Sequence, residues 1–248
     1  MCRMPFDKKK SKNFRPYGIC LVAITIVTLM IVGCAGNKGK PDPSDSARKP
    51  AAAAKPKMPV ADESQLQMEP NHFSNLSALD PQPAKETLQA GLAVVYFYDY
   101  FARHLNPLSQ GYIDPATSQP GQPIPYLNHQ FEREVVFDSG TNRGVAMRMK
   151  GLLYLPDTGE YTFRAVSNDG LRIYLDDQMI INDPTQHSDR YAVPAVVDIR
   201  VKGWYPLMVE YFQRKGTAAV KFFWRKPGAA DFTAIPAQSY AHIPGSAP

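Results

Sequence analysis

The chain has 248 residues, and its 28 lysines and arginines against 23 aspartates and glutamates give a formal net charge of +5. Six of the basic residues and one of the acidic residues precede Cys34, so the remaining chain carries 22 of each and is neutral. The charge therefore indicates no basic surface for nucleic acid, and we expect no nucleic-acid partner. All three cysteines lie at or before Cys34, which excludes a disulfide, a cysteine metal site or a thiol nucleophile in the rest of the chain.

The first 33 residues are organised like an export signal. Basic residues precede an apolar run over residues 19–32, which is shorter than the roughly 20 residues that cross a bilayer as a helix. The run ends in Val32-Gly33 directly before Cys34, and this arrangement resembles the lipobox of bacterial lipoproteins. We therefore predict a lipoprotein signal peptide over residues 1–33 and lipidation of Cys34. An uncleaved signal anchor with an incidental cysteine is the alternative.

The residue after the cysteine indicates a location. Ala35 follows Cys34, whereas an aspartate would be the retention signal, and this resembles sorting of Gram-negative lipoproteins to the outer membrane. We expect a protein of the bacterial cell envelope that is anchored in the outer membrane through lipid, including palmitate, on Cys34.

Residues 34–88 have the composition of a flexible tether. Eight prolines punctuate lysine, alanine, aspartate and serine, and large apolar residues are few. Such a segment cannot bury enough apolar surface to offset its chain entropy. We expect it to carry a folded domain, residues 89–248, away from the membrane surface.

The domain over residues 89–248 shows strand patterns and no sustained helical period. Apolar and polar residues alternate over residues 161–165 and 171–175, so one face of each strand is expected to be buried. On the second strand the inward-facing set is Leu171, Ile173 and Leu175. Further strands are expected at residues 91–99, 145–154, 193–201, 206–212 and 218–224. Many short strands separated by turn signals predict an all-β fold, an antiparallel β-sandwich or barrel.

Four short motifs occur in order within this domain: Pro-Asp-Thr-Gly at 156–159, Ser-Asn-Asp-Gly at 167–170, Lys-Gly-Trp-Tyr at 202–205 and Phe-Phe-Trp at 222–224. The series resembles the protective-antigen-type (PA-14) domain, a module of a bacterial toxin, yeast adhesins, glycosidases and bacterial surface proteins. The resemblance implies the same β-sandwich here. It does not fix a function, because one fold carries many grafted sites.

The resemblance also implies a metal site. In the sugar-binding members, two adjacent aspartates joined by a cis peptide bind Ca²⁺, which in turn ligates sugar hydroxyls. Asn168 and Asp169 occupy these positions here, so we expect them to be the metal ligands, with one charge fewer and a lower affinity. The alternative is that residues 167–170 are only a hairpin turn whose side chains bond their own backbone.

A second polar loop follows the strand after this turn. Asn182, Asp183, His187 and Asp189 should lie near Asn168 if the intervening strands pair, and we predict them as ligand-binding residues. The alternative is a solvated connection between strands.

The sequence carries no catalytic signature, so we expect no enzymatic activity. A nucleophile elbow, a phosphate-binding glycine loop and a zinc-protease histidine pair are all missing from the sequence. Asp176 and Asp177 are adjacent, and adjacent strand residues point to opposite faces, so they are poorly arranged as a glycosidase pair. We predict a non-catalytic, lipid-anchored envelope module that binds carbohydrate or another surface ligand, with Ca²⁺ as the expected cofactor. The alternative is a structural or accessory lipoprotein with an envelope protein as partner.

Overall fold

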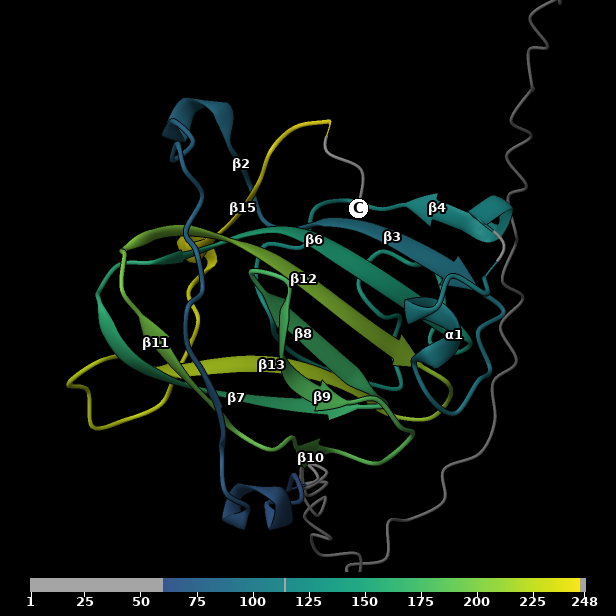
Figure 1. Cartoon of the computed structure of the whole chain (residues 1–248). Coiled ribbons are helices and arrows are strands. Elements are labelled where there is room, and N and C mark those ends of the chain that lie inside the picture. Colours follow the sequence, from purple (N-terminus) through teal and green to yellow (C-terminus); the bar gives the residue numbers. More distant parts are fainter. Residues whose placement is uncertain (1–59, 114, 246–248) are drawn as a thin grey trace, which may run out of the picture. The chain divides into compact units, whose positions relative to one another are not determined.

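The computed structural model describes residues 60–113 and 115–245. The predicted signal, Cys34 and the first part of the predicted tether lie outside these residues. The described chain forms two packed β-sheets, which lie one above the other in Figure 1. Nearly all of their strand pairs are antiparallel, so the predicted all-β sandwich is confirmed.

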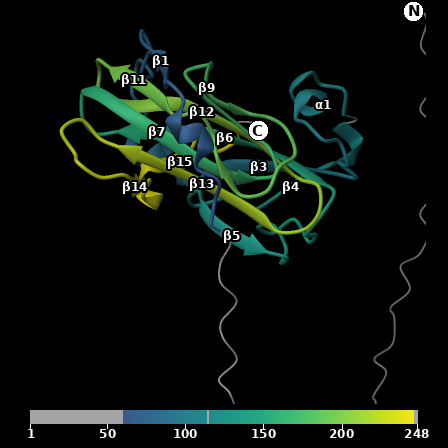
Figure 2. The same cartoon turned by 90° about the horizontal axis from the view of Figure 1, so that it is seen from below.

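Sheet A, seen from below in Figure 2, has the strand order β1–β11–β7–β13–β14, with β10 beside β7 and β5 beside β13. Its strands are β1 (Asn71–Phe73), β5 (Asn128–Glu132), β7 (Gly159–Asn168), β10 (Arg190–Tyr191), β11 (Ala195–Ile199), β13 (Ala218–Arg225) and β14 (Thr233–Ala234).

Sheet B has the order β2–β15–β6–β12–β8–β9, with β3 beside β6 and β4 beside β3. Its strands are β2 (Gln89–Ala90), β3 (Ala93–Tyr98), β4 (Ser118–Pro120), β6 (Val145–Leu155), β8 (Leu171–Leu175), β9 (Gln178–Asp183), β12 (Gly203–Gln213) and β15 (Tyr240–His242).

The helices of the described chain are single turns. They are η1 (Ser64–Gln67), η2 (Lys85–Thr87), α1 (Asn106–Ser109), η3 (Pro115–Thr117) and η4 (Ala237–Ser239). In the part of the chain that the structure describes, none of them is long and apolar enough to span a membrane.

The core lies between the two sheets and is built from the alternating residues of each strand. On β8, Leu171, Ile173 and Leu175 are all buried in it, as the period-two pattern predicts. Aromatic rings dominate the facing side of sheet A, where Phe163 and Phe222 stack with ring centroids 5.3 Å apart. The strand register expected for β8 is therefore confirmed.

The outer face of sheet B is partly covered by the segment that contains α1. Leu105 and Leu108 of this segment pack with Tyr100 and with Phe212 of β12 in a second apolar cluster. Because α1 lies over the strands, Glu210 of β12 is also buried, although its side chain points away from the main core. The segment is thus held to the sheet by apolar and polar contacts.

Residues 60–88 are part of the folded domain, which corrects the boundary expected at residue 88. Strand β1 pairs in parallel with β11, and Leu79 N–H donates to the Trp204 carbonyl at 2.9 Å. Asp62 N–H donates to the Asp189 carbonyl at 2.8 Å. A polar, proline-rich segment can attach to a sheet through its backbone alone, because backbone N–H and C=O groups do not depend on side-chain composition.

Candidate functional site

The Ser-Asn-Asp-Gly turn connects the two sheets. It leaves β7 in sheet A and enters β8 in sheet B, so it is not the hairpin turn that the sequence suggested. Asn168 and Asp169 are joined by a cis peptide bond and are 5% and 2% exposed. The Asn168 amide donates to Asp189 Oδ1 at 2.7 Å and to Thr217 Oγ1 at 3.0 Å. Both side chains therefore bond other segments of the chain and join three loops at one end of the sandwich.

Asp169 is the one acid of this turn, and it is deeply buried. Burial raises the pKa of its carboxyl group, and the backbone N–H groups of Arg214 and His187 oppose that rise. The Arg214 N–H donates to Asp169 Oδ2 at 2.7 Å. The carboxylate is thus held by protein donors from the loop after β12.

The structure separates the four residues predicted on the second polar loop. Asp189 meets Asn168 directly and also accepts a hydrogen bond from Gln130 Nε2 at 2.8 Å. Asn182 lies on the outer face of sheet B, where its Oδ1 accepts from Arg172 Nε at 3.0 Å, so it does not join the turn. The prediction that this loop lies near Asn168 therefore holds for Asp189 and for His187, whose backbone N–H bonds Asp169.

Asp183 and His187 form a supporting pair behind the turn. His187 Nε2 lies 3.1 Å from Asp183 Oδ2, and Arg190 pairs with the same carboxylate. Burial alone would raise the pKa of Asp183, but hydrogen bonds from His187 and Arg190 outweigh it and lower the pKa. This ion-paired group fixes the position of the loop that carries His187.

The strands β7, β9 and β12 end at one end of the sandwich (Figure 1). Residues of the loops that follow them line an open cavity of about 570 Å³, here called the loop hollow. Five chain segments line it, and their residues are Arg103, Arg133, Asn168, Asp169, Gln186, His187, Ser188, Lys215, Gly216 and Thr217. The lining is almost entirely polar or charged. Such a surface suits a ligand rich in hydroxyl or charged groups.

The loop hollow contains three cationic side chains that the sequence did not predict as site residues. Arg103, Arg133 and Lys215 are exposed, and none of them forms an ion pair in the described chain. They stand in loops after three different strands, and none belongs to a motif. No signal in the sequence could have found them, because only the sheet topology brings these loops together.

Residues 131–237 match the PA14 domain family. This part of the chain is a PA14 domain. The match covers β6 to β14 and so includes the turn and the loop hollow, apart from Arg103. A comparison with curated protein sequences finds no match.

Solved structures share the fold of this PA14 domain. An anti-sigma factor domain-containing protein is 19% identical with a TM-score of 0.53, covering 64% of this chain and 50% of that chain. The chain thus spans about half the length of that structure. The epithelial adhesin 9 A domain of Candida glabrata, in complex with Galβ1-4GlcNAc, is 12% identical with a TM-score of 0.50, covering 71% and 98%. The epithelial adhesin 6 A domain of the same organism, in complex with Galβ1-3GlcNAc, is 11% identical with a TM-score of 0.50, covering 65% and 90%.

The donor atoms of the PA14 domain fit Ca²⁺ poorly at Asn168 and Asp169. Calcium takes about six to eight oxygen ligands. Here Asp169 Oδ2 is occupied by the Arg214 N–H, and the Asn168 amide nitrogen is turned toward Asp189. In the part of the chain that the structure describes, no group of three or more His, Cys, Asp or Glu side chains could hold a metal ion. Calcium binding, which the resemblance implies, stays a prediction. The donor atoms at Asn168 and Asp169 do not favour it.

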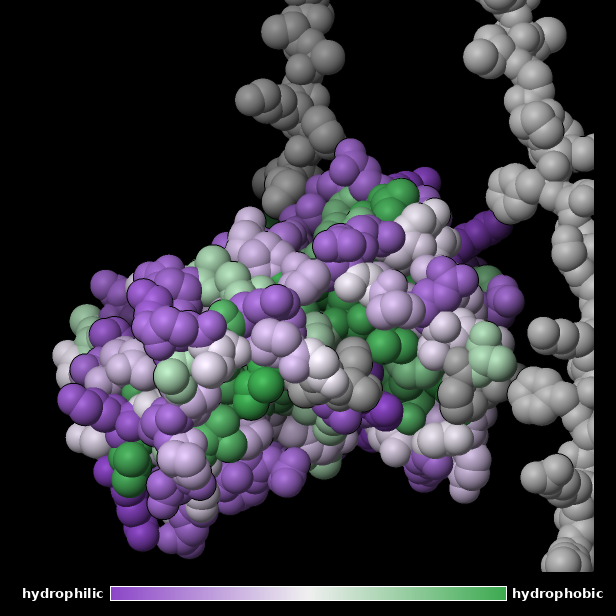
Figure 3. All heavy atoms as spheres, turned by 90° about the horizontal axis from the view of Figure 1, so that it is seen from above, coloured by the Kyte–Doolittle hydropathy of each residue, from purple (hydrophilic) through white to green (hydrophobic). Residues whose placement is uncertain are grey.

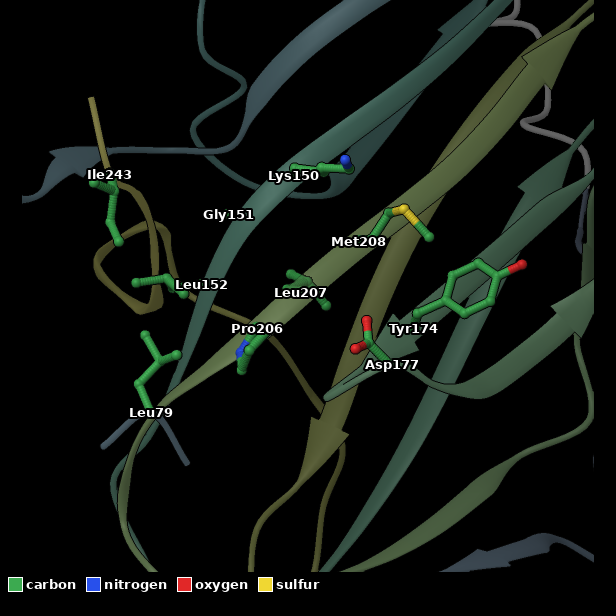
Figure 4. A pocket seen from close by; sticks show the side chains of 10 residues that line it. All are labelled: Leu79, Lys150, Gly151, Leu152, Tyr174, Asp177, Pro206, Leu207, Met208 and Ile243. Atoms are coloured by element: carbon green, nitrogen blue, oxygen red, sulfur yellow. The ribbon is translucent and has the colours of Figure 1, made fainter. Parts of the chain in front are cut away.

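A second cavity, here called the sheet groove, lies on the outer face of sheet B and has a volume of about 430 Å³ (Figure 4). Apolar side chains gather at several places on the surface seen from above in Figure 3. The residues that line the groove are Leu79, Lys150, Gly151, Leu152, Tyr174, Asp177, Pro206, Leu207, Met208 and Ile243. The groove is mainly apolar, and Lys150, Tyr174 and Asp177 are its polar lining residues.

Proposed function

We propose that this PA14 domain is a non-catalytic carbohydrate-binding module and that the loop hollow is its ligand site. The observation that carries the proposal is the convergence of polar side chains from five segments on one open cavity. The Candida glabrata adhesin domains, which share the fold, were solved with disaccharides bound, and this supports a sugar as the ligand. Specificity then resides in the loops at the end of the sandwich.

A glycan array probed with the purified protein tests this proposal. Ser188→Trp should fill the loop hollow and abolish binding, because Ser188 is an exposed lining residue whose side chain makes no hydrogen bond in the described structure. Met208→Trp introduces the same side chain in the sheet groove and should leave binding unchanged. An array without any specific signal would overturn the module proposal. Loss of binding only in Met208→Trp would move the site to the groove.

The sheet groove favours a second candidate function, an accessory lipoprotein that binds a protein. A mainly apolar cavity on an open sheet face suits a protein partner better than a sugar. Under this alternative, Met208→Trp rather than Ser188→Trp should disrupt the interaction.

We further propose that lipid on Cys34 anchors the domain in the outer membrane. In cells given labelled palmitate, Cys34→Ser should lose the label and accumulate with its signal uncleaved, because lipidation precedes cleavage at a lipobox. Cys20→Ser, a change within the apolar run, is the control and should keep the label. Unchanged labelling of Cys34→Ser would contradict the anchor.

Thermal melts test for the calcium ion. If Ca²⁺ bound only the native state, it would raise the free energy of unfolding by about 2.7 kcal/mol at a Ca²⁺ concentration of a hundred times Kd. From the donor set we expect the wild-type melting temperature to be the same in millimolar calcium and in chelator. Asn168→Asp should melt lower in chelator, since it places a third carboxylate beside Asp169 and Asp189, and calcium should partly restore the melting temperature. Asp198→Asn, at an exposed ion pair, controls for nonspecific calcium effects. A calcium-dependent rise for the wild type would establish the ion site.

A further inference from the structure

We infer that the loop hollow binds acidic saccharides, recognising a carboxylate on the sugar with its own cationic side chains and without a metal ion. This inference rests on the proposed function and names its ligand class. It begins with the charges around the cavity.

The acids near the loop hollow are already engaged by the protein. Asp169 accepts the Arg214 N–H at 2.7 Å, and Asp189 accepts from Asn168 at 2.7 Å and Gln130 at 2.8 Å. Asp183, behind them, is paired with Arg190 and His187, and all three acids are buried. Each of these carboxylates is thus buried and accepts hydrogen bonds from the protein, although Asp169 also lines the cavity.

The cations of the loop hollow are in the opposite situation. Arg103, Arg133 and Lys215 line the cavity, are exposed, and have no carboxylate partner among the ion pairs of the described chain. Singly, such a side chain would be screened by water and salt. Three of them around one concave surface can converge on a single anion, and arginine binds a carboxylate through two parallel hydrogen bonds.

The same cavity offers neutral groups for sugar hydroxyls. Because the Asn168 side-chain nitrogen donates to Asp189 and Thr217, the side-chain oxygen Oδ1 is left as an acceptor. The Ser188 hydroxyl also lines the cavity. A volume of about 570 Å³ lies within the range of about 300–1,000 Å³ of small-molecule sites. Hydroxyls beside a carboxylate are the combination that a uronic acid presents.

Isothermal titration of the full protein with two probes tests the inference. Trigalacturonate and α-1,4-galactotriose share their backbone and differ by a carboxylate or a hydroxymethyl group on each ring. In chelator, we expect trigalacturonate to bind at least about tenfold more tightly, with an affinity that falls as salt is raised. The triple variant Arg103→Gln, Arg133→Gln, Lys215→Gln should lose about tenfold or more. A matched triple outside the cavity, Arg200→Gln, Lys202→Gln, Lys226→Gln, removes the same charge and should change the affinity less than about twofold.

Each contrary result has a definite meaning. Equal loss in both triple variants would overturn the inference, because the attraction would then be a general charge effect. Binding of galactotriose as tightly as trigalacturonate, or binding abolished by chelator, would overturn it and leave the carbohydrate module intact. Binding of neither probe would also overturn it, and the glycan array then shows whether the proposed function falls as well.

Discussion

Replacing Ile173 with alanine is expected to lower the free energy of unfolding by about 2–5 kcal/mol. Ile173 lies in the middle of β8, pairs in register with Val209 of β12 and Ile181 of β9, and is fully buried between the sheets. The substitution removes buried methyl and methylene groups and leaves a cavity that a close-packed sandwich core can only partly close. Urea denaturation monitored by tryptophan fluorescence measures the change.

A matched exposed site separates this cavity effect from general perturbation. Val201 is 57% exposed, so Val201→Ala should change the free energy of unfolding by less than about 0.5 kcal/mol. Equal shifts of the two denaturation midpoints would contradict the burial of Ile173 in the core, because a buried large-to-small change should cost far more than the same kind of change at an exposed site.

The register of β8 could be predicted because its alternation has a direct physical cause. One face of the strand meets sheet A and the other meets polar groups of the α1 segment, so Leu171, Ile173 and Leu175 differ from Arg172 in their surroundings. Alternation reports which side chains share a face. It does not report which strand lies beside which.

That limit explains the error at the turn after β7. Two alternating strands separated by Ser-Asn-Asp-Gly suggest a hairpin, yet β7 pairs with β11 and β13 while β8 pairs with β9 and β12. Strand pairing depends on contacts far apart in the chain, which a local pattern cannot contain. The attachment of residues 60–88 escaped prediction for a related reason, since backbone pairing such as that of β1 leaves little trace in composition.

The candidate site was predictable only where a motif marked it. Asn168 and Asp169 stand out in the sequence, and the structure places Asp189 beside them. Arg103, Arg133 and Lys215 carry no local signal, yet they determine the charge of the cavity. When a site is assembled from several loops, the sequence can therefore predict the turn that carries a motif. It cannot predict the residues on the other loops, which distinguish one ligand class from another.

A buried acid on the outer face of sheet B is also unmarked in the sequence. Glu210 alternates with the core residues Val209 and Tyr211 and would be expected in solvent, but it is only 1% exposed. Arg148 donates to its Oε1 from Nη2 at 2.8 Å and from Nε at 3.2 Å, and the Ser109 hydroxyl of α1 bonds its Oε2. The Arg148 contacts join β6 to β12, and the Ser109 contact fastens the α1 segment to the sheet.

Arg148→Met is expected to lower the free energy of unfolding by about 3–5 kcal/mol, because it leaves the Glu210 carboxylate buried without its charged partner. Methionine keeps most of the apolar stem of arginine, so the loss reports the missing charge and hydrogen bonds more than missing packing. The companion variant, Arg148→Met with Glu210→Gln, removes the uncompensated charge and should recover part of the stability. Urea midpoints of the wild type, both single variants and the double variant form a double-mutant cycle that isolates the coupling between the two side chains. Additive effects of the two substitutions would mean that the pair contributes nothing beyond the separate contacts of its two side chains.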